Sequence, residues 1–276
     1  MNKGFTLVEL SIVLIIIGLL VGGVLIGQNL IESAKLSAFV SQMQQIDAAA
    51  AIFKDKYKAL PGDADLARVA IRGTGGPMTP KIRDGILCDD DCSAANFWSN
   101  TEAQNFWYEL NVLGGVKFEN CKTFSTQSGR REMVTSGPNC NVPTAKLGEK
   151  AMIFIHNTSN NPALNINYYV IADCSGMQRV PSAGFFNDAH SDTPSNRACW
   201  RPYTGGQAYA YDNKVDDGSA TTGNVVASVK NMVYPNSSPG GLSDTDGDQT
   251  IGGSQSSYNV SSQEPTHNLM QVIGTQ

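Results

Sequence analysis

Residues 10–27 read LSIVLIIIGLLVGGVLIG and contain no charged side chain. At about 1.5 Å per helical residue, a helix from Phe5 to Gly27 would be about 30 Å long, which is the thickness of the hydrocarbon core of a bilayer. A secretory signal has a shorter apolar region followed by small residues at a cleavage site, whereas here helix-compatible sequence continues without a break. We therefore predict a membrane-spanning helix over residues 5–27.

An acidic residue, Glu9, lies near the start of this predicted span. A charge inside a membrane costs on the order of 3 kcal/mol unless it has a partner, so an ionisable residue there indicates a function. A plain single-pass anchor is the simplest alternative, and it gives Glu9 no role.

Around Glu9 the chain reads KGFTLVEL over residues 3–10. This segment resembles the processing site of type IV pilins and of the pseudopilins of type II secretion. The resemblance implies that a prepilin peptidase cleaves between Gly4 and Phe5 on the cytoplasmic side of the membrane, and that the new Phe5 amine is methylated. It also implies an inner-membrane assembly platform and other pilin subunits as partners, with the subunit held in the membrane before assembly.

The charge of Glu9 gains a role in this setting. Cleavage would leave an ammonium on Phe5 at the membrane edge, and the Glu9 carboxylate could neutralise the ammonium of a neighbouring subunit. A subunit entering out of register would leave an unpaired charge in the apolar core of a filament, at a cost of several kcal/mol. We therefore predict that Glu9 sets the register of assembly.

The sequence after the apolar run predicts an amphipathic continuation of the same helix over residues 28–57. Apolar residues recur at spacings of three and four, with polar residues between them. The apolar positions are Leu36, Phe39, Met43, Ile46, Ala50, Phe53 and Tyr57, and the polar ones are Gln42, Gln44, Gln45, Asp47, Lys54 and Lys56. Pro61-Gly62 then predicts the end of the helix.

These features divide the chain into a leader over residues 1–4, a long helix over residues 5–57 and a globular exported head over residues 58–276. The resemblance implies a single pass through the bacterial inner membrane with the head in the periplasm. The subunit would later enter a surface or periplasmic filament.

The head contains signals for one short helix and several strands. Ser99 and Glu102 form a capping-box pattern before a run with one apolar helical face, which predicts a helix over residues 100–113. Strand-like runs lie at residues 151–155, 166–172 and 207–211, with a weaker one at 225–232. We predict an α+β fold in which the long N-terminal helix packs on an antiparallel sheet, with a short extra helix and disulfide-bonded loops.

The six cysteines follow none of the usual zinc-ligand spacings, which together with the apolar N-terminus favours an oxidising compartment. Fifteen pairings are possible. We predict nearest-neighbour disulfides, which join Cys88 to Cys92, Cys121 to Cys140 and Cys174 to Cys199. A metal site at the first pair is the alternative, but disulfides are more common in an exported chain.

Two acidic segments raise the weaker hypothesis of a calcium site. The first, residues 244–248, resembles the opening of an EF-hand loop. However, Gln249 and Gln255 stand where that loop needs a turning glycine and a bidentate glutamate. The second, residues 212–218, resembles a motif of larger pilin-like heads, and calcium binds the heads of some pseudopilins. Turn chemistry alone is the alternative for both. The acids are Asp244, Asp246 and Asp248 in the first segment and Asp212, Asp216 and Asp217 in the second.

Composition and motifs argue against catalysis and against nucleic-acid binding. The 276 residues are 41% hydrophobic, which excludes wholesale disorder, and the formal charge of -5 is unfavourable for contact with phosphates. The three histidines, His156, His190 and His267, are isolated in the sequence, and no zinc-protease, nucleophile-elbow or phosphate-loop motif is present. We predict a protein that is not an enzyme.

Three functions remain open at this point. The resemblance implies a structural subunit of a type IV pilus or related filament, and the large head favours a minor or specialised one. A minor pseudopilin of a type II secretion system would have the same N-terminus. The third possibility is a calcium-dependent tip adhesin or binding head.

Overall fold

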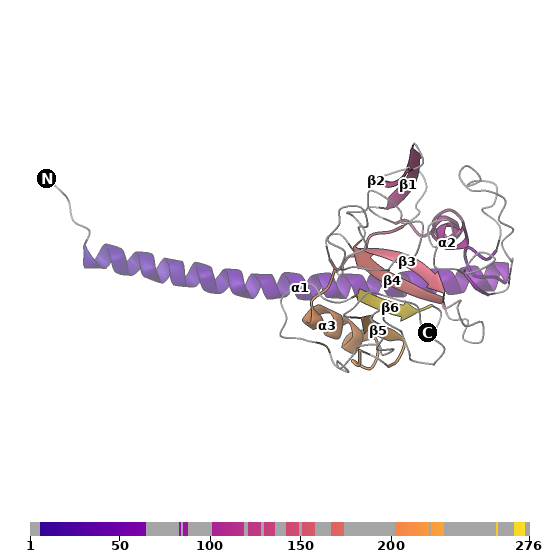
Figure 1. Ribbon diagram of the computed structural model, residues 1–276. Coiled ribbons are helices and arrows are strands. Elements are labelled where there is room, and N and C mark those ends of the chain that lie inside the picture. Colours follow the sequence, from indigo (N-terminus) through magenta and orange to yellow (C-terminus); the bar gives the residue numbers. More distant parts are fainter. Residues whose placement is uncertain are drawn as a thin grey trace, which may run out of the picture.

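The computed structural model describes residues 6–64, 83, 85–87, 101–118, 121–127, 130–135, 142–148, 151–157, 167–173, 202–220, 222–228, 258 and 268–273. A long helix runs into a head that contains an antiparallel sheet, which confirms the predicted α+β class (Figure 1). In chain order the elements are α1 (Leu7–Tyr57), α2 (Thr101–Val112), β1 (Lys122–Gln127), β2 (Arg130–Thr135), β3 (Ala151–Asn157), β4 (Asn167–Asp173), α3 (Gly205–Val215), β5 (Val225–Ser228) and β6 (Asn268–Val272).

The helix α1 is continuous over 51 residues, a length of about 77 Å at 1.5 Å per residue. Its N-terminal part projects from the head and its C-terminal part lies along the sheet (Figure 1). The helix ends at Tyr57 because Lys58 adopts the left-handed conformation, with φ 58°, and donates its N–H to the carbonyl of Lys54. Pro61 and Gly62 follow after Ala59 and Leu60, close to the end that the sequence predicts.

The main sheet has four antiparallel strands in the order β3-β4-β6-β5. The last strand of the chain, β6, therefore lies between β4 and β5, and Leu269 pairs with both Ile171 and Ala227. The outer edge of β3 is covered in part by residues 142–145, because Thr144 forms a bridge with Met152. A separate hairpin joins β1 and β2.

The core lies between α1, α2, α3 and the sheet. Buried side chains of α1 repeat at helical spacing, and those of β4 are buried on both faces, as expected for a strand covered on both sides. From α2, Trp107 packs edge-on against Phe106, with ring centroids 4.9 Å apart. The largest fully buried side chains include Phe39, Met43, Ile46, Phe53, Phe106, Trp107, Leu110, Tyr169, Tyr203 and Tyr211.

The structure corrects one predicted strand. Residues 207–211 belong to the helix α3 and not to a strand. The alternating QAYAY sequence suggested a strand, but Thr204 and Gln207 form a capping box that starts a helix, and Ala208, Tyr211 and Asp212 bury one helical face. The hairpin β1–β2 and the strand β6 were not predicted.

Other predicted elements are present near their expected positions. The helix expected over residues 100–113 is α2, although Ser99 lies outside the described residues. The strands expected at residues 151–155 and 166–172 are β3 and β4. The weaker strand expected from residue 225 is β5, which the structure describes as far as Ser228.

Candidate functional site

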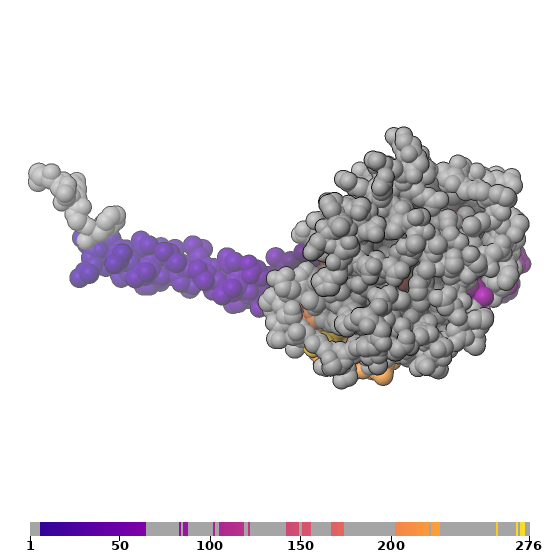
Figure 2. Space-filling view, viewed as in Figure 1, coloured from indigo at the N-terminus to yellow at the C-terminus, as the bar shows by residue number. Residues whose placement is uncertain are grey.

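The N-terminal half of α1 presents an apolar surface to solvent. The large hydrophobic side chains from Leu7 to Ile31 are 49–86% exposed, and we call residues 7–31 the apolar rod (Figure 2). By length and composition, α1 is the one helix of the described ranges that could cross a membrane. Because water disfavours such a surface, a bilayer or other apolar helices must cover it.

Glu9 caps the start of α1 from within its own chain. The backbone N–H and the hydroxyl of Thr6 each donate to Glu9 Oε2, both at 2.8 Å. In return, the Thr6 hydroxyl accepts the N–H of Glu9 at 3.3 Å, which completes a capping box. These bonds hold the carboxylate at the positive end of the helix dipole. Glu9 is therefore held at the N-terminal end of the rod by contacts within its own chain.

Two exposed contacts join α1, just beyond the rod, to α3. Gln207 Nε2 donates to Glu32 Oε1 at 3.0 Å, and Lys214 Nζ donates to Ser37 Oγ at 2.9 Å. They lie near opposite ends of α3, so this helix lies beside α1 where the rod meets the head (Figure 1).

A third contact fastens α1 to the segment that covers the edge of β3. Gln42 Nε2 donates to the carbonyl of Thr144 at 2.8 Å, and Gln42 Oε1 accepts the N–H of Lys146 at 2.9 Å. One side-chain amide thus satisfies a backbone acceptor and a backbone donor of the same segment. The sequence pattern placed Gln42 among the polar positions, and the structure gives it this specific partner.

Asp47 departs from the predicted amphipathic pattern. It was expected on the polar face, but only 7% of it is exposed, and it lies against the sheet. Gln271 Nε2, from β6, donates to Asp47 Oδ2 at 3.0 Å, and Gln271 Oε1 accepts the hydroxyl of Tyr211 from α3. The burial of Asp47 depends on this partner 224 residues away, which no local pattern could reveal.

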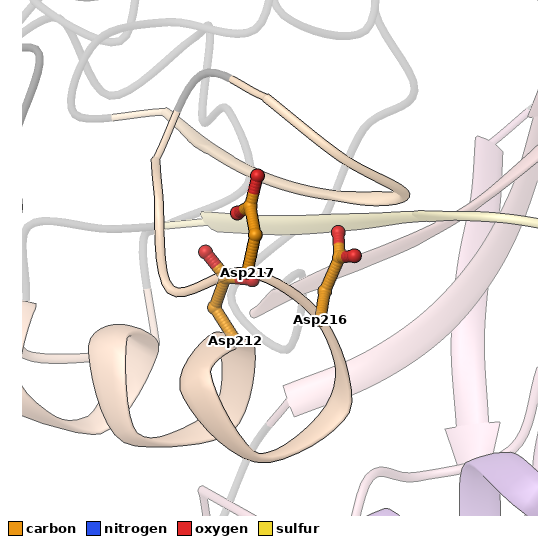
Figure 3. Close-up of side chains that lie close together, drawn as sticks. All are labelled: Asp212, Asp216 and Asp217. Atoms are coloured by element: carbon orange, nitrogen blue, oxygen red, sulfur yellow. The ribbon is translucent and has the colours of Figure 1, made fainter.

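The second acidic segment forms a cluster at the C-terminal end of α3 (Figure 3). One carboxylate oxygen from each of Asp212, Asp216 and Asp217 lies within 4.8 Å of the others. Asp212 is fully buried, its Oδ2 accepts the hydroxyl of Tyr258 at 2.5 Å, and its Oδ1 has no hydrogen-bond partner. Burial raises the pKa of Asp212 to about 6, and the charges of Asp217 and Asp216 also raise it, while the Tyr258 hydroxyl opposes this shift.

Asp216 and Asp217 hold the turn that follows α3. Hydrogen bonds from Thr222 and Ser219 lower the pKa of Asp217, so this carboxylate stays charged at neutral pH. The donors to Asp216 Oδ2 are the N–H groups of Asn224 and of Val225, the latter at 2.8 Å, and the donors to Asp217 are the Ser219 N–H at 2.8 Å and the Thr222 hydroxyl at 2.6 Å. The turn chemistry that the sequence suggested is therefore present, beside a buried carboxylate oxygen that it does not satisfy.

Several predicted site residues lie outside the described residues. These are Gly4 and Phe5 at the processing site, the acids Asp244, Asp246 and Asp248, and the cysteines Cys88, Cys92, Cys140, Cys174 and Cys199. The remaining cysteine, Cys121, is half-buried, packs against the core and is disulfide-bonded. Which cysteine pairs with which stays a prediction.

Comparison with known families identifies the N-terminal segment. Residues 1–25 match the prokaryotic N-terminal methylation motif, the signal of type IV pilins and pseudopilins. The motif implies processing by a prepilin peptidase and assembly with other pilin subunits, and it is a signal of structural pilin-type proteins and not of an enzyme family. Together with the apolar rod it supports anchoring in a membrane before assembly. No curated protein and no solved structure matches the chain.

Proposed function

We propose that the chain is a minor or specialised structural subunit of a type IV pilus or related filament, assembled through the apolar rod after cleavage between Gly4 and Phe5. The observation that supports this most directly is the exposed rod itself, which lies within and just beyond the methylation motif. In this proposal the subunit waits in the bacterial inner membrane with its head in the periplasm, and an assembly platform moves it into the filament.

Glu9 would then contact the amine of a neighbouring subunit. Its Oε2 already accepts two hydrogen bonds from Thr6, so the carboxylate can meet an incoming ammonium without first being ordered. Charge pairing inside an apolar filament core is favourable only with close geometry, and a register error would leave both charges unpaired.

Two variants of Glu9 separate its charge from its role as a helix cap. Glu9→Gln keeps a residue that completes a capping box but removes the charge, whereas Glu9→Val removes both. We expect both variants to be cleaved and to remain in the membrane, and both to be absent from purified filaments. Glu32→Gln, which alters an exposed acid on the same helix, is the matched control and should assemble.

Other results would reject parts of the proposal. Normal assembly of Glu9→Val would rule out charge pairing. If Glu9→Gln assembled and Glu9→Val did not, Glu9 would be required as part of the helix cap and not for its charge. An uncleaved N-terminus in the mature protein would exclude the processing step. Mass spectrometry of the N-terminus and immunoblots of sheared filaments measure these outcomes.

A minor pseudopilin of a type II secretion system is the alternative with the same N-terminal chemistry. The two can be separated by location and phenotype. A pilus subunit should be recovered in sheared surface filaments, whereas a pseudopilin should be absent from them and its deletion should block secretion of folded proteins.

A calcium-dependent binding head is a second candidate, favoured by the buried Asp212 Oδ1, which has no hydrogen-bond partner. Calcium accepts six to eight oxygen ligands at about 2.3–2.6 Å, so oxygens within about 5 Å of each other can share one ion. We expect calcium to raise the melting temperature of the full chain above that in EDTA, and Asp212→Asn to abolish the increase. Equal melting temperatures with calcium and with EDTA would reject this site.

A further inference from the structure

The contact between α1 and the sheet contains a buried carboxyl group whose second oxygen is not satisfied. Asp47 Oδ2 accepts a hydrogen bond from Gln271, but Oδ1 is buried without a partner. The hydroxyl of Tyr169, from β4, is also buried without a partner. It lies close enough to Asp47 to favour the charged carboxylate, although the two groups are outside normal hydrogen-bond geometry.

The surrounding groups hold this arrangement in place. The Tyr211 hydroxyl donates to Gln271 Oε1, which fixes the Gln271 amide so that its N–H points to Asp47. The Tyr169 ring is enclosed by α2, with centroids 6.0 Å from that of Phe106 and 6.1 Å from that of Trp107. Asp47 is 7% exposed among these partners, so a charge on it is largely removed from water.

We propose that Asp47 is a proton-operated clamp between α1 and the sheet, in which the neutral acid holds the helix against β4 and β6 more tightly than the carboxylate does. A proton on the carboxyl group removes a charge that is buried at this contact with a hydrogen-bond partner at Oδ2 alone, so the neutral acid costs less to bury than the carboxylate. At higher pH, where Asp47 loses its proton, the charged carboxylate is buried between α1 and the sheet, and the contact between them weakens.

The titration expected for Asp47 agrees with this geometry. Burial raises its pKa from 3.8 to about 6, while the hydroxyl of Tyr169 and the amide of Gln271 lower it. Among the residues that the structure describes, the other titratable groups that interact with it are Tyr169 and Tyr211, and burial, with the charge of Asp47, raises the pKa of each. Both tyrosines therefore stay neutral, and Asp47 is the group that changes charge.

The direction of the effect follows from where the proton is bound. Between about pH 4 and about pH 6 the folded chain keeps a proton on Asp47 that the unfolded chain has released, so the free energy of unfolding falls as the pH rises through this window. If the head lies outside the cytoplasm, as the proposed function holds, this clamp would respond to the pH outside the cell.

The test uses the full chain in detergent micelles with EDTA, melted at about pH 5 and at about pH 7.5. We expect the wild type to melt about 5 °C lower at the higher pH. Asp47→Asn, a neutral amide that can still accept from Gln271, should melt higher than the wild type at the higher pH and should lose the part of the pH dependence that Asp47 contributes, while the part due to Asp212 remains. Asp55→Asn, which alters an exposed acid on the same helix, is the matched control and should keep it.

Further variants keep the test decisive. Asp212→Asn removes the other buried acid of raised pKa, and it should leave unchanged the contribution of Asp47 to the pH dependence of the melting temperature. Tyr169→Phe removes a hydroxyl that favours the charged carboxylate, so the midpoint of the profile should move to higher pH. At the higher pH, hydrogen exchange in β6 should be slower in Asp47→Asn than in the wild type.

Two results would overturn the clamp. One is the same pH dependence in Asp47→Asn and in the wild type. The other is a Tyr169→Phe midpoint that does not move, together with unchanged hydrogen exchange in β6. Because these measurements need neither processing nor filaments, their failure would leave the proposed assembly through Glu9 untouched.

Discussion

Gly62 shows how one backbone position fixes the exit from the long helix. Its φ is +88°, and a Cβ atom there would lie 2.2 Å from the carbonyl oxygen of Glu102 on α2. Its N–H donates to Glu109 Oε2 at 2.8 Å, so this hydrogen bond joins the turn to α2. A glycine is required here for its conformation and for the close approach of two backbones.

We therefore expect Gly62→Ala to lower the free energy of unfolding by more than about 3 kcal/mol. Gly85→Ala is the matched control, because its φ is +81° but no atom lies within 4 Å of the added Cβ. It should lose only about 1 kcal/mol, from the strained backbone alone. Thermal or denaturant unfolding measures both, and equal losses would show that the contact with α2 does not matter.

At the scale of single residues, the sequence predicts a functional residue when the signal lies in its immediate sequence neighbours. Glu9 stands out because an acid inside an apolar span is rare and costly. Asp47 does not stand out, because its helical neighbours are partly polar and its partner Gln271 arrives from the last strand. The burial of a polar side chain depends on a distant donor, which single-sequence patterns do not contain.

Among the elements, those with strong local signals were predicted best. The apolar span and the 3.6-residue periodicity predicted α1, and continuous apolar runs predicted β3 and β4. For α3, alternation suggested a strand, although the pattern of Thr204 and Gln207 was available as a helix start. The strand β6 is short, and its place between β4 and β5 is set by tertiary pairing.

The attachment of α1 to the edge of the sheet gives a prediction at this scale. Gln42→Ala removes both hydrogen bonds to the segment that covers β3, at Thr144 and Lys146. We expect a loss of about 1–2 kcal/mol in the free energy of unfolding. Gln45→Ala, which removes only a local bond to Ser41, should change it by less than about 0.5 kcal/mol. Similar effects of both variants in urea unfolding would argue against a specific role of Gln42 in attaching α1 to this segment.

In the whole molecule, the exposed apolar rod lies apart from the surface of α1 that packs in the core. Buried residues of α1 begin at Phe39, and the exposed large hydrophobics of the apolar rod end at Ile31. The contacts of Glu32 and Ser37 with α3 also lie beyond the rod. Removal of about the first 30 residues should therefore take away the apolar surface without opening the core.

We expect this truncated protein to be soluble, monomeric and folded without detergent, because its longest apolar surface is gone. Light scattering coupled to size exclusion measures its mass, and near-ultraviolet circular dichroism compares its aromatic packing with that of the full chain in detergent. The full chain transferred to buffer without detergent is the control and should associate. Oligomers that persist after truncation, with native packing retained, would show that the head itself carries an assembly surface and that the rod is not the main cause of association.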